Sequence, residues 1–472
     1  MASQEELPAS RSKRLPRVAV ILAAGQGTRM RSSLPKVLHE VAGRPMLAWV
    51  LDAARDAGCE RLLVVVGHGA EKVRQALESP DITWVYQHEQ LGTGHAVLQA
   101  APEVTRESLV LVLSGDVPLV SGATLTSLAE MASAGWGALA VAMLEEPGGL
   151  GRVLTHLEGD FSRIVEAVDA NPEELAVQRV NAGLYALPGP EVFEALSQLG
   201  TDNAQGEIYL TDAVTAAASQ GRKVGLLELA DPAEAWGVND RRQLAQVHQR
   251  LLQRTVERLM KSGVTILDPD RTAVEPGVDV GRDTVLHPGV TLLGHTVIGE
   301  GCTLHAGAHL RDCHIGAGVT IEPYSCLHKT QVADSCRVGP FARLRPGAVL
   351  DTGARVGNFV EVKNSHLGEG SKAGHLAYLG DARVGEGANI GAGVVTCNYD
   401  GEKKHRSEIG KKAFVGSDTM LVAPVSVGDG ATTAAGSVIT NDVPAGDLGV
   451  GRARQRNVSG WAKRRSRGNE GD

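Results

Sequence analysis

The chain has 472 residues, more than one hydrophobic core usually supports, so two or three domains are expected. Its 57 glycines exceed the usual share of about 7%, whereas aromatic residues make up only 3%. This composition favours a repetitive, tightly wound backbone with small side chains. A formal net charge of -8 indicates no general basic surface, so we expect no nucleic-acid partner.

The cysteines and the N-terminal residues indicate the compartment. The 6 cysteines include no C-x-x-C pair, so neither a disulfide framework nor a zinc site is indicated, and a reducing cytoplasm fits best. No run approaches the ~18 apolar residues of a membrane span, and residues 1–16 lack an apolar signal-peptide core. We therefore expect a cytoplasmic protein with no membrane partner and a disordered extension over 1–16.

Apolar runs that end at a glycine or a small residue alternate with helical segments in the first half of the chain. The runs cover 18–22, 62–66 and 109–113, and helices are predicted over 47–57, 70–77 and 94–101. This alternation predicts an α/β domain over 17–239 with a doubly wound, mostly parallel, Rossmann-like sheet. Ligands bind such sheets outside the carboxyl ends of the strands, where Gly25, Gly27 and Asp116 fall.

The second half has a different period. Residues 240–261 contain no Gly or Pro and predict a linker helix over 240–263. Beyond it, with two one-residue slips and one charged insertion, apolar residues recur six positions apart at Val280, Leu286, Leu292, Ile298, Leu304, Leu310, Ile315, Ile321, Leu327, Val332, Val338, Leu344, Leu350, Val356, Val362, Ile390, Ile409, Val415, Leu421, Val427, Thr433 and Ile439. Three hexads would close one triangular coil, which predicts a parallel β-helix over 264–457. The end of the chain has no such periodicity, so we expect a mobile tail over 458–472. The alternative is a β-sandwich with chance spacing, and the number of in-register positions favours the β-helix.

The first glycine turn carries residue types that handle phosphates. It reads Leu22-Ala-Ala-Gly-Gln-Gly-Thr-Arg-Met30, and Leu-Pro-Lys36 follows. Backbone N–H groups of glycine turns approach phosphate oxygens, and cations offset the charge of a triphosphate. The spacing matches neither the dinucleotide fingerprint nor the P-loop, so by itself it leaves a structural turn as an equal alternative.

The string resembles the signature of sugar-1-phosphate nucleotidyltransferases, and further pieces of that signature follow in order. The resemblance implies a site for UTP and the UDP-sugar at Leu22, Ala23, Ala24, Gly25, Lys36, Gln87, Gly92, Thr93, Gly151, Glu166, Asn181 and Asn239. It also implies that Asp116 and Asn239 bind Mg²⁺, and that Arg29 and Lys36 stabilise the departing pyrophosphate. No protein nucleophile is needed, because the phosphate of the sugar attacks UTP directly. Ser114 departs from the pattern, which has an aromatic residue before the Gly-Asp pair.

Polar residues interrupt the hexad repeat between 343 and 401, where small or aliphatic residues would suffice for structure. The interruptions are the segments 343–347, 358–363, 372–381 and 397–401, which contain Arg, Lys, His, Tyr and Asn. A lone histidine is more often structural or on the surface than catalytic. Several such residues on adjacent coils indicate a polar site.

These segments match, in order, the acetyltransferase half of a bacterial family that joins N-acetylglucosamine-1-phosphate uridyltransferase to glucosamine-1-phosphate acetyltransferase. The resemblance covers about 18–456 and implies a left-handed β-helix and a homotrimer with acyl sites between subunits. It implies that His375 is the base that takes a proton from the substrate ammonium before attack on acetyl-CoA. The residues implied for glucosamine phosphate are Arg345, Lys363, Tyr378 and Asn389, and those implied for the amine or acetyl-CoA are Ala392, Asn398, Tyr399, Ser417, Ala435 and Arg452.

Three alternatives make distinct predictions. A nucleotidyltransferase with a regulatory β-helix would have a degraded acyl site, yet His375 and Lys363 are present. A non-catalytic assembly subunit would lack Arg29, Lys36 or Asp116, and none is lost. A zinc enzyme of the γ-carbonic-anhydrase type needs three converging histidines. Its candidates occupy different faces of the hexad, and we interpret them as surface residues: His287, His295, His305, His309 and His314.

Overall fold

The computed structural model describes residues 15–104, 107–201 and 203–462, which form two compact units that divide between Leu251 and Leu252. The division falls within α8 (Arg241–Lys261), the helix that was expected over 240–263. Most of the predicted extension 1–16 and the end of the predicted tail 458–472 lie outside the described residues. Among the residues described, no helix is long and apolar enough to cross a membrane.

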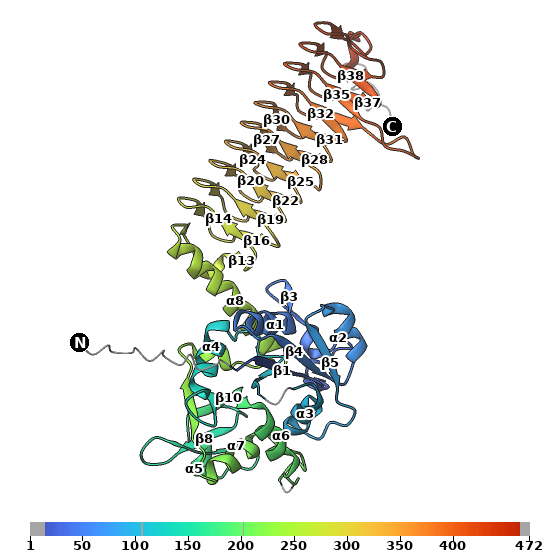
Figure 1. Cartoon of the computed structure of the whole chain (residues 1–472). Helices are drawn as coiled ribbons and strands as arrows, with labels where there is room; N and C mark the ends of the chain where they lie inside the picture. Colours follow the sequence, from blue (N-terminus) through green and yellow to red (C-terminus); the bar gives the residue numbers. More distant parts are fainter. Residues whose placement is uncertain (1–14, 105–106, 202, 463–472) are drawn as a thin grey trace, which may run out of the picture. The chain divides into compact units, whose positions relative to one another are not determined.

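The first unit is built on a nine-stranded sheet with the path β11-β7-β10-β6-β1-β4-β5 and the hairpin β8-β9 attached to β10 (Figure 1). The strands are β1 (Arg17–Ala23), β4 (Arg61–Val66), β5 (Ile82–Tyr86), β6 (Leu109–Ser114), β7 (Gly137–Met143), β8 (Arg152–Thr155), β9 (Phe161–Val165), β10 (Arg179–Pro188) and β11 (Val224–Glu228). β1, β4, β5 and β6 are parallel, whereas β10 runs antiparallel to both β6 and β7. The predicted doubly wound, mostly parallel sheet is therefore confirmed.

Helices cover both faces of this sheet. They are α1 (Met46–Asp56), α2 (Ala70–Leu77), α3 (Thr93–Gln99), α4 (Gly122–Ala132), α5 (Pro172–Leu175), α6 (Gly189–Ser197) and α7 (Leu210–Ser219), with short turns η1 (Thr28–Met30), η2 (Lys36–Leu38), η3 (Ala101–Glu103) and η4 (Pro232–Ala235). Side chains of a strand alternate between faces, so Ile21 packs with residues of α1 and α4, and Val20 packs with residues of α3, α6 and α7. Burial on both faces explains the continuous apolar runs.

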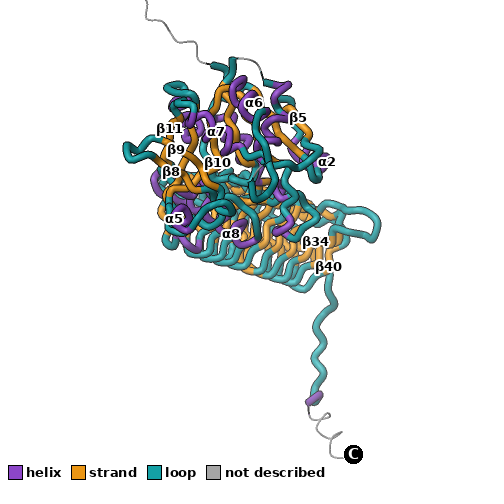
Figure 2. Tube along the Cα trace, turned by 90° about the horizontal axis from the view of Figure 1, so that it is seen from below, coloured by secondary structure: helices purple, strands orange, loops and turns teal. Residues whose placement is uncertain are grey.

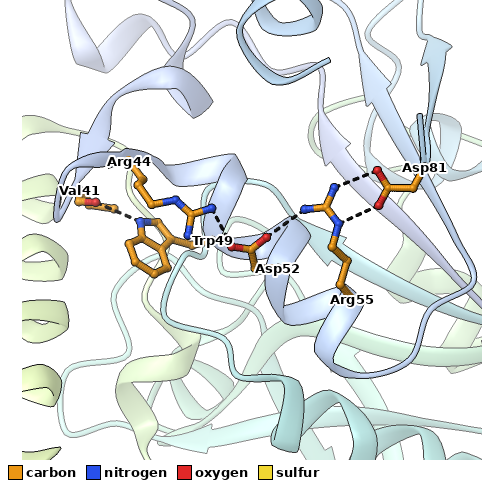
Figure 3. Close-up of polar contacts among 6 residues, drawn as sticks. All are labelled: Val41, Arg44, Trp49, Asp52, Arg55 and Asp81. Atoms are coloured by element: carbon orange, nitrogen blue, oxygen red, sulfur yellow. Dashed lines mark hydrogen bonds and ion pairs between the residues drawn. The ribbon is translucent and has the colours of Figure 1, made fainter. Parts of the chain in front are cut away.

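A chain of polar contacts holds the exposed side of α1 (Figure 3). The Arg44 guanidinium lies 4.7 Å from the centre of the Trp49 ring and donates to Asp52 at 2.7 Å. Arg55 donates to Asp52 at 2.9 Å and to Asp81 at 2.7 Å, and its hydrogen bond lowers the pKa of Asp81 to about 2. These contacts tie α1 to the hairpin β2 (Glu40–Val41) and β3 (Arg44–Pro45) on one side and to the start of β5 on the other.

The second unit is a left-handed parallel β-helix in which three successive strands, one from each of three parallel sheets, make one coil. Figure 2 shows these coils stacked one behind another, with short strands joined by loops. The first sheet holds β12 (Thr265–Ile266), β15 (Val285–Leu286), β18 (Thr303–Leu304), β21 (Thr320–Ile321), β24 (Arg337–Val338), β27 (Arg355–Asn358), β30 (Lys372–His375), β33 (Asn389–Ile390), β36 (Phe414–Val415), β39 (Thr432–Thr433) and β41 (Leu448–Gly449). The second holds β13 (Ala273–Val274), β16 (Thr291–Leu293), β19 (His309–Arg311), β22 (Cys326–His328), β25 (Arg343–Leu344), β28 (Glu361–Lys363), β31 (Tyr378–Gly380), β34 (Val395–Cys397), β37 (Met420–Val422) and β40 (Val438–Ile439). The third holds β14 (Asp279–Val280), β17 (Val297–Ile298), β20 (His314–Ile315), β23 (Gln331–Val332), β26 (Val349–Leu350), β29 (His366–Leu367), β32 (Ala382–Val384), β35 (Ser407–Ile409) and β38 (Val425–Val427).

The hexad positions form the interior of this β-helix. Leu286 pairs with Leu304 on the next coil. Ile298 pairs with Ile315, and the separation of this pair along the chain is one residue shorter, at the position where the sequence predicts a slip in the repeat. Every predicted inward position from Leu286 onward is buried, and Val280 is partly buried. The charged insertion forms a loop over 398–406 that projects beyond the coils (Figure 1). We call this segment the insertion loop.

Candidate active sites

A cavity of about 280 Å³ opens at the carboxyl ends of β1 and β6 in the first unit. Its lining includes nine predicted residues: Leu22, Ala23, Ala24, Gly25, Lys36, Gln87, Gly92, Thr93 and Asp116. It also includes Val37, Ala96 and Glu207, to which the sequence reasoning gave no role, and Gln90 and Ser114. Glu207 reaches the cavity because its side chain lies against Gly92, a contact between segments far apart in the sequence.

Three predicted residues meet at one side of this cavity: Lys36 and Asp116 line it, and Asn239 contacts Lys36 from outside the lining. The Lys36 ammonium donates to the Asp116 carboxylate and, at 3.2 Å, to the side-chain carbonyl oxygen of Asn239. Both oxygens therefore converge on a space that one cation occupies, and hard oxygen ligands of this kind suit Mg²⁺. Gly27 makes this approach possible, because a Cβ atom at Gly27 would lie 2.7 Å from the Cβ atom of Lys36.

The neighbouring polar side chains are held by the cavity walls. Gln90 donates its amide to the Ala24 carbonyl at 2.8 Å, and the Gln87 amide contacts His95 at 3.0 Å and Gly92 at 3.3 Å. Arg29 lies exposed on η1 and makes no hydrogen bond or ion pair with any other described residue. Its guanidinium is therefore available to an anion from outside the chain.

The residues predicted for the sugar lie together next to this cavity but not in its lining. The backbone N–H of Asn181 donates to the Gly151 carbonyl at 2.9 Å, and a Cβ atom at Gly151 would lie 3.3 Å from the Glu166 carboxylate. Burial raises the pKa of Glu166, and a hydrogen bond of 3.1 Å from the Thr211 hydroxyl partly offsets this rise. Asn181 donates to the Tyr185 hydroxyl at 2.5 Å. The fold thus brings together Gly151, directly before β8, Glu166, directly after β9, and Asn181 on β10.

In the second unit, five residues lie on successive coils at the edge that follows the first sheet. They are Asn358, His375, Ala392, Ser417 and Ala435, which we call the base edge. Backbone hydrogen bonds link these coils, among them Asp418 to the Ala392 carbonyl at 2.7 Å and Gly436 to the Ser417 carbonyl at 2.8 Å. The predicted base and three predicted coenzyme contacts therefore form one column, and Arg452 lies beside Gly436 at its end.

The next edge of the same prism carries the predicted phosphate-binding cations. Arg345 directly follows β25 and Lys363 ends β28, the next strand of the second sheet, and Lys404 of the insertion loop lies close to Lys363. Contact with the positively charged Lys404 lowers the pKa of Lys363, whereas the Glu361 carboxylate, which accepts from Arg345 at 2.8 Å, raises the pKa of Arg345. We call Arg345, Lys363 and Lys404 the cation edge. The sequence predicts no role for Lys404, although the break in the hexads at 403–408 marks its position.

Tyr378 begins β31 of the second sheet, and Asn389 begins β33 of the first sheet. Tyr378 pairs with Glu361 across β28 and β31, and its hydroxyl lies over Gly380, where an added Cβ atom would be 2.5 Å from it. Asn389 pairs with Lys372, three residues before the predicted base. Both side chains are partly exposed, so they are accessible to a ligand beside the base edge.

A buried carboxylate that the sequence reasoning did not assign holds the insertion loop. Asp381 accepts hydrogen bonds from the Asn364 and Asn398 side-chain amides, each at 2.5 Å. The backbone N–H of Ser407 also donates to the Asp381 carbonyl at 3.2 Å. Asp381 therefore fixes both ends of the loop that carries Lys404. Asn398 is buried by this contact, whereas Tyr399 is 60% exposed.

The histidines of the zinc alternative do not form a metal site. Among the described residues, no group of three His, Cys, Asp or Glu side chains could hold a metal ion. The rings of His287 and His305 pack on each other with centres 4.6 Å apart, and His309 and His314 belong to the second and third sheets. The zinc alternative therefore has no structural support in this part of the chain.

Comparison with known proteins places both units in known families. A MobA-like NTP transferase domain matches residues 19–210, a bacterial transferase hexapeptide repeat matches 295–329, and a hexapeptide repeat of succinyl-transferase matches 408–441. The chain is similar to the bifunctional protein GlmU of Pelobacter propionicus, with 48% identity over 94% of this chain and 97% of the relative. The GlmU proteins of Stutzerimonas stutzeri and Trichlorobacter lovleyi are also 48% identical, over 94% and 95% of this chain and 98% and 99% of theirs. The chain therefore belongs to the GlmU family of bifunctional enzymes, which combine a uridyltransferase with a hexapeptide-repeat acetyltransferase.

Proposed function

We propose that the second unit acetylates glucosamine 1-phosphate with acetyl-CoA and that the first unit then joins the product to UTP, releasing pyrophosphate and forming UDP-N-acetylglucosamine. The observation that carries the uridyl step is the meeting of Asn239 with Lys36 and Asp116, which line the cavity at the ends of β1 and β6. Phosphoryl chemistry between two anions depends on such positioning and charge neutralisation.

In the uridyl site, Asp116 and Asn239 would hold Mg²⁺, which when bound offsets phosphate charge. Lys36 would then release these oxygens and contact the triphosphate, together with the exposed Arg29. Gln87 and the glycine turn would bind the uridine part, and Gly151, Glu166 and Asn181 would bind the amino sugar. The last assignment is supported by their contacts with one another beside the cavity.

In the acyl site, His375 would take a proton from the ammonium of glucosamine 1-phosphate so that the free amine attacks the thioester carbonyl. The cation edge would bind the sugar phosphate, since Arg345, Lys363 and Lys404 supply three positive groups. Tyr378 and Asn389 would bind the sugar. Acetyl-CoA would lie along the base edge, where small corner residues leave room for an extended chain, with Tyr399 and Asn398 at its reactive end and Arg452 near a coenzyme phosphate.

We also propose a homotrimer whose acyl sites lie between subunits. An exposed apolar ridge runs beside the base edge, and its residues are Tyr324 (61% exposed), Phe341 (48%), Phe359 (57%) and Leu376 (61%). The three rings stack with centres 5.4 Å apart. Exposed apolar surface of this extent favours association, which would enclose the neighbouring base edge between copies. All 6 cysteines are free thiols, which supports a cytoplasmic enzyme.

A coupled assay with glucosamine 1-phosphate, acetyl-CoA, UTP and Mg²⁺ tests the assignment of each unit. We expect His375→Ala to abolish acetyl transfer and retain uridyl transfer, and Asp116→Ala to do the reverse. Each variant is the folding control for the other, because the two reactions are measured separately on one chain. Full acetyl transfer by His375→Ala, or full uridyl transfer by Asp116→Ala, would contradict the corresponding assignment.

A further inference from the structure

The ring of His375 has one hydrogen-bond partner among the described residues. Its Nδ1 atom lies 2.5 Å from the Oδ1 atom of Asn358, on the preceding coil. A carbonyl oxygen can only accept, so this contact requires a hydrogen on Nδ1, and in the neutral ring Nε2 then carries none. Neutral imidazole with a free Nε2 atom is the form that can take a proton.

The backbone is built locally to bring these two side chains together. β27 and β30 are four residues long, whereas every other strand of the first sheet has two, and the added length ends in the pair Asn358 and His375. A Cβ atom at Gly357 would lie 1.9 Å from the Gly374 carbonyl oxygen. Only glycine at 357 therefore lets the two strands continue side by side into the corner.

The same corner position on the preceding coils carries no polar side chain. The register puts Pro288, Ala306, Pro323 and Pro340 in the column that Asn358 and His375 continue. On those coils the corner folds without a side-chain amide, so the fold of the corner does not by itself require Asn358. Its amide appears where the column meets the predicted base.

We propose that Asn358 is a positioning residue for acetyl transfer, which holds the His375 ring in the orientation and tautomer that present Nε2 to the substrate amine. The proposal rests on the function assigned above to His375. Removing the acceptor lets the ring rotate and populate the tautomer with a hydrogen on Nε2, which cannot act as the base. The loss falls on kcat, because the substitution changes the base, whereas the cations proposed for the sugar phosphate and for the coenzyme phosphate, such as Arg345 and Arg452, are unchanged.

The test compares Asn358→Leu, Asn358→Ala and Asn358→Asp in the full chain. We expect the Leu and Ala variants to lower kcat of acetyl transfer by about 10- to 100-fold with unchanged KM for acetyl-CoA. Asp also only accepts, so it should restore most of the rate. Its negative charge favours imidazolium, so the acidic limb of the pH–rate profile should move up by about 1 pH unit. Uridyl transfer reports folding in each variant.

Asp351→Leu is the matched control. Asp351 also contacts a histidine on the next coil, His366, at 2.8 Å, but this pair lies at β26 and β29 of the third sheet, away from the base edge. It should leave acetyl transfer unchanged. A wild-type kcat for Asn358→Leu overturns the proposal, and so does an Asp variant that is as slow as the Leu variant with an unshifted pH profile. If His375→Ala itself retains acetyl transfer, the assigned base is wrong and the failure lies in the proposed function.

Discussion

Replacing Asp381 tests whether the insertion loop is needed for acetyl transfer. The Asp381 side chain is 8% exposed and accepts from two amides, and one of the donors, Asn398, is 7% exposed. A hydrogen bond to a charged group contributes about 1.5–3 kcal/mol, so Asp381→Ala should cost about 3–6 kcal/mol locally. In a solenoid such a loss stays local, and we expect the loop to detach while the coils persist.

The assay is steady-state acetyl transfer with uridyl transfer measured on the same sample. A loss of 3 kcal/mol changes an equilibrium by about 100-fold. We therefore expect kcat/KM of acetyl transfer to fall at least 10-fold, through KM for both substrates, because Tyr399 and Lys404 leave the site. Asp312→Ala is the matched control, since Asp312 also occupies a positive-φ corner (52°, against 49° for Asp381) and accepts from His295 at 3.1 Å. Normal acetyl transfer by Asp381→Ala, or an equal loss in Asp312→Ala, would refute the reasoning.

Four further outcomes are expected. Chelation of divalent ions should abolish uridyl transfer and spare acetyl transfer, and restoration by added Mg²⁺ checks the cause. Glu166→Gln should raise the unfolding temperature of the first unit at pH 8, because burial raises the pKa of Glu166, and ionising this side chain costs stability above its ordinary pKa of 4.5. The gain should vanish below that pH. The variant should also bind N-acetylglucosamine 1-phosphate more weakly. Leu310→Ala removes a fully buried side chain and should lower the free energy of unfolding of the β-helix by about 3–5 kcal/mol in denaturant titration. Phe341→Glu should dissociate the proposed trimer in sedimentation and reduce acetyl transfer more than uridyl transfer.

The β-helix and its interior follow from the sequence, because a period of six is a local property of the chain. Each inward position, such as Leu344 or Val415, is buried because every coil repeats the same backbone geometry, so its burial does not depend on contacts with distant segments of the chain. The buried strands of the first unit, such as 62–66, are likewise marked by continuous apolar runs that only a sheet covered on both faces requires. The glycine turn and the polar interruptions also mark where chemistry is placed.

Contacts between distant segments were decided only by the tertiary structure. The approach of Lys36 to Asn239, more than 200 residues away, depends on the path of the sheet, and no local pattern contains it. The antiparallel direction of β10, the anchoring of the insertion loop by Asp381 and the pairing of Asn358 with His375 likewise depend on which coil or strand lies next to which. Residue type and spacing specify the elements and their buried faces, whereas the register between strands determines which polar atoms come within hydrogen-bonding distance.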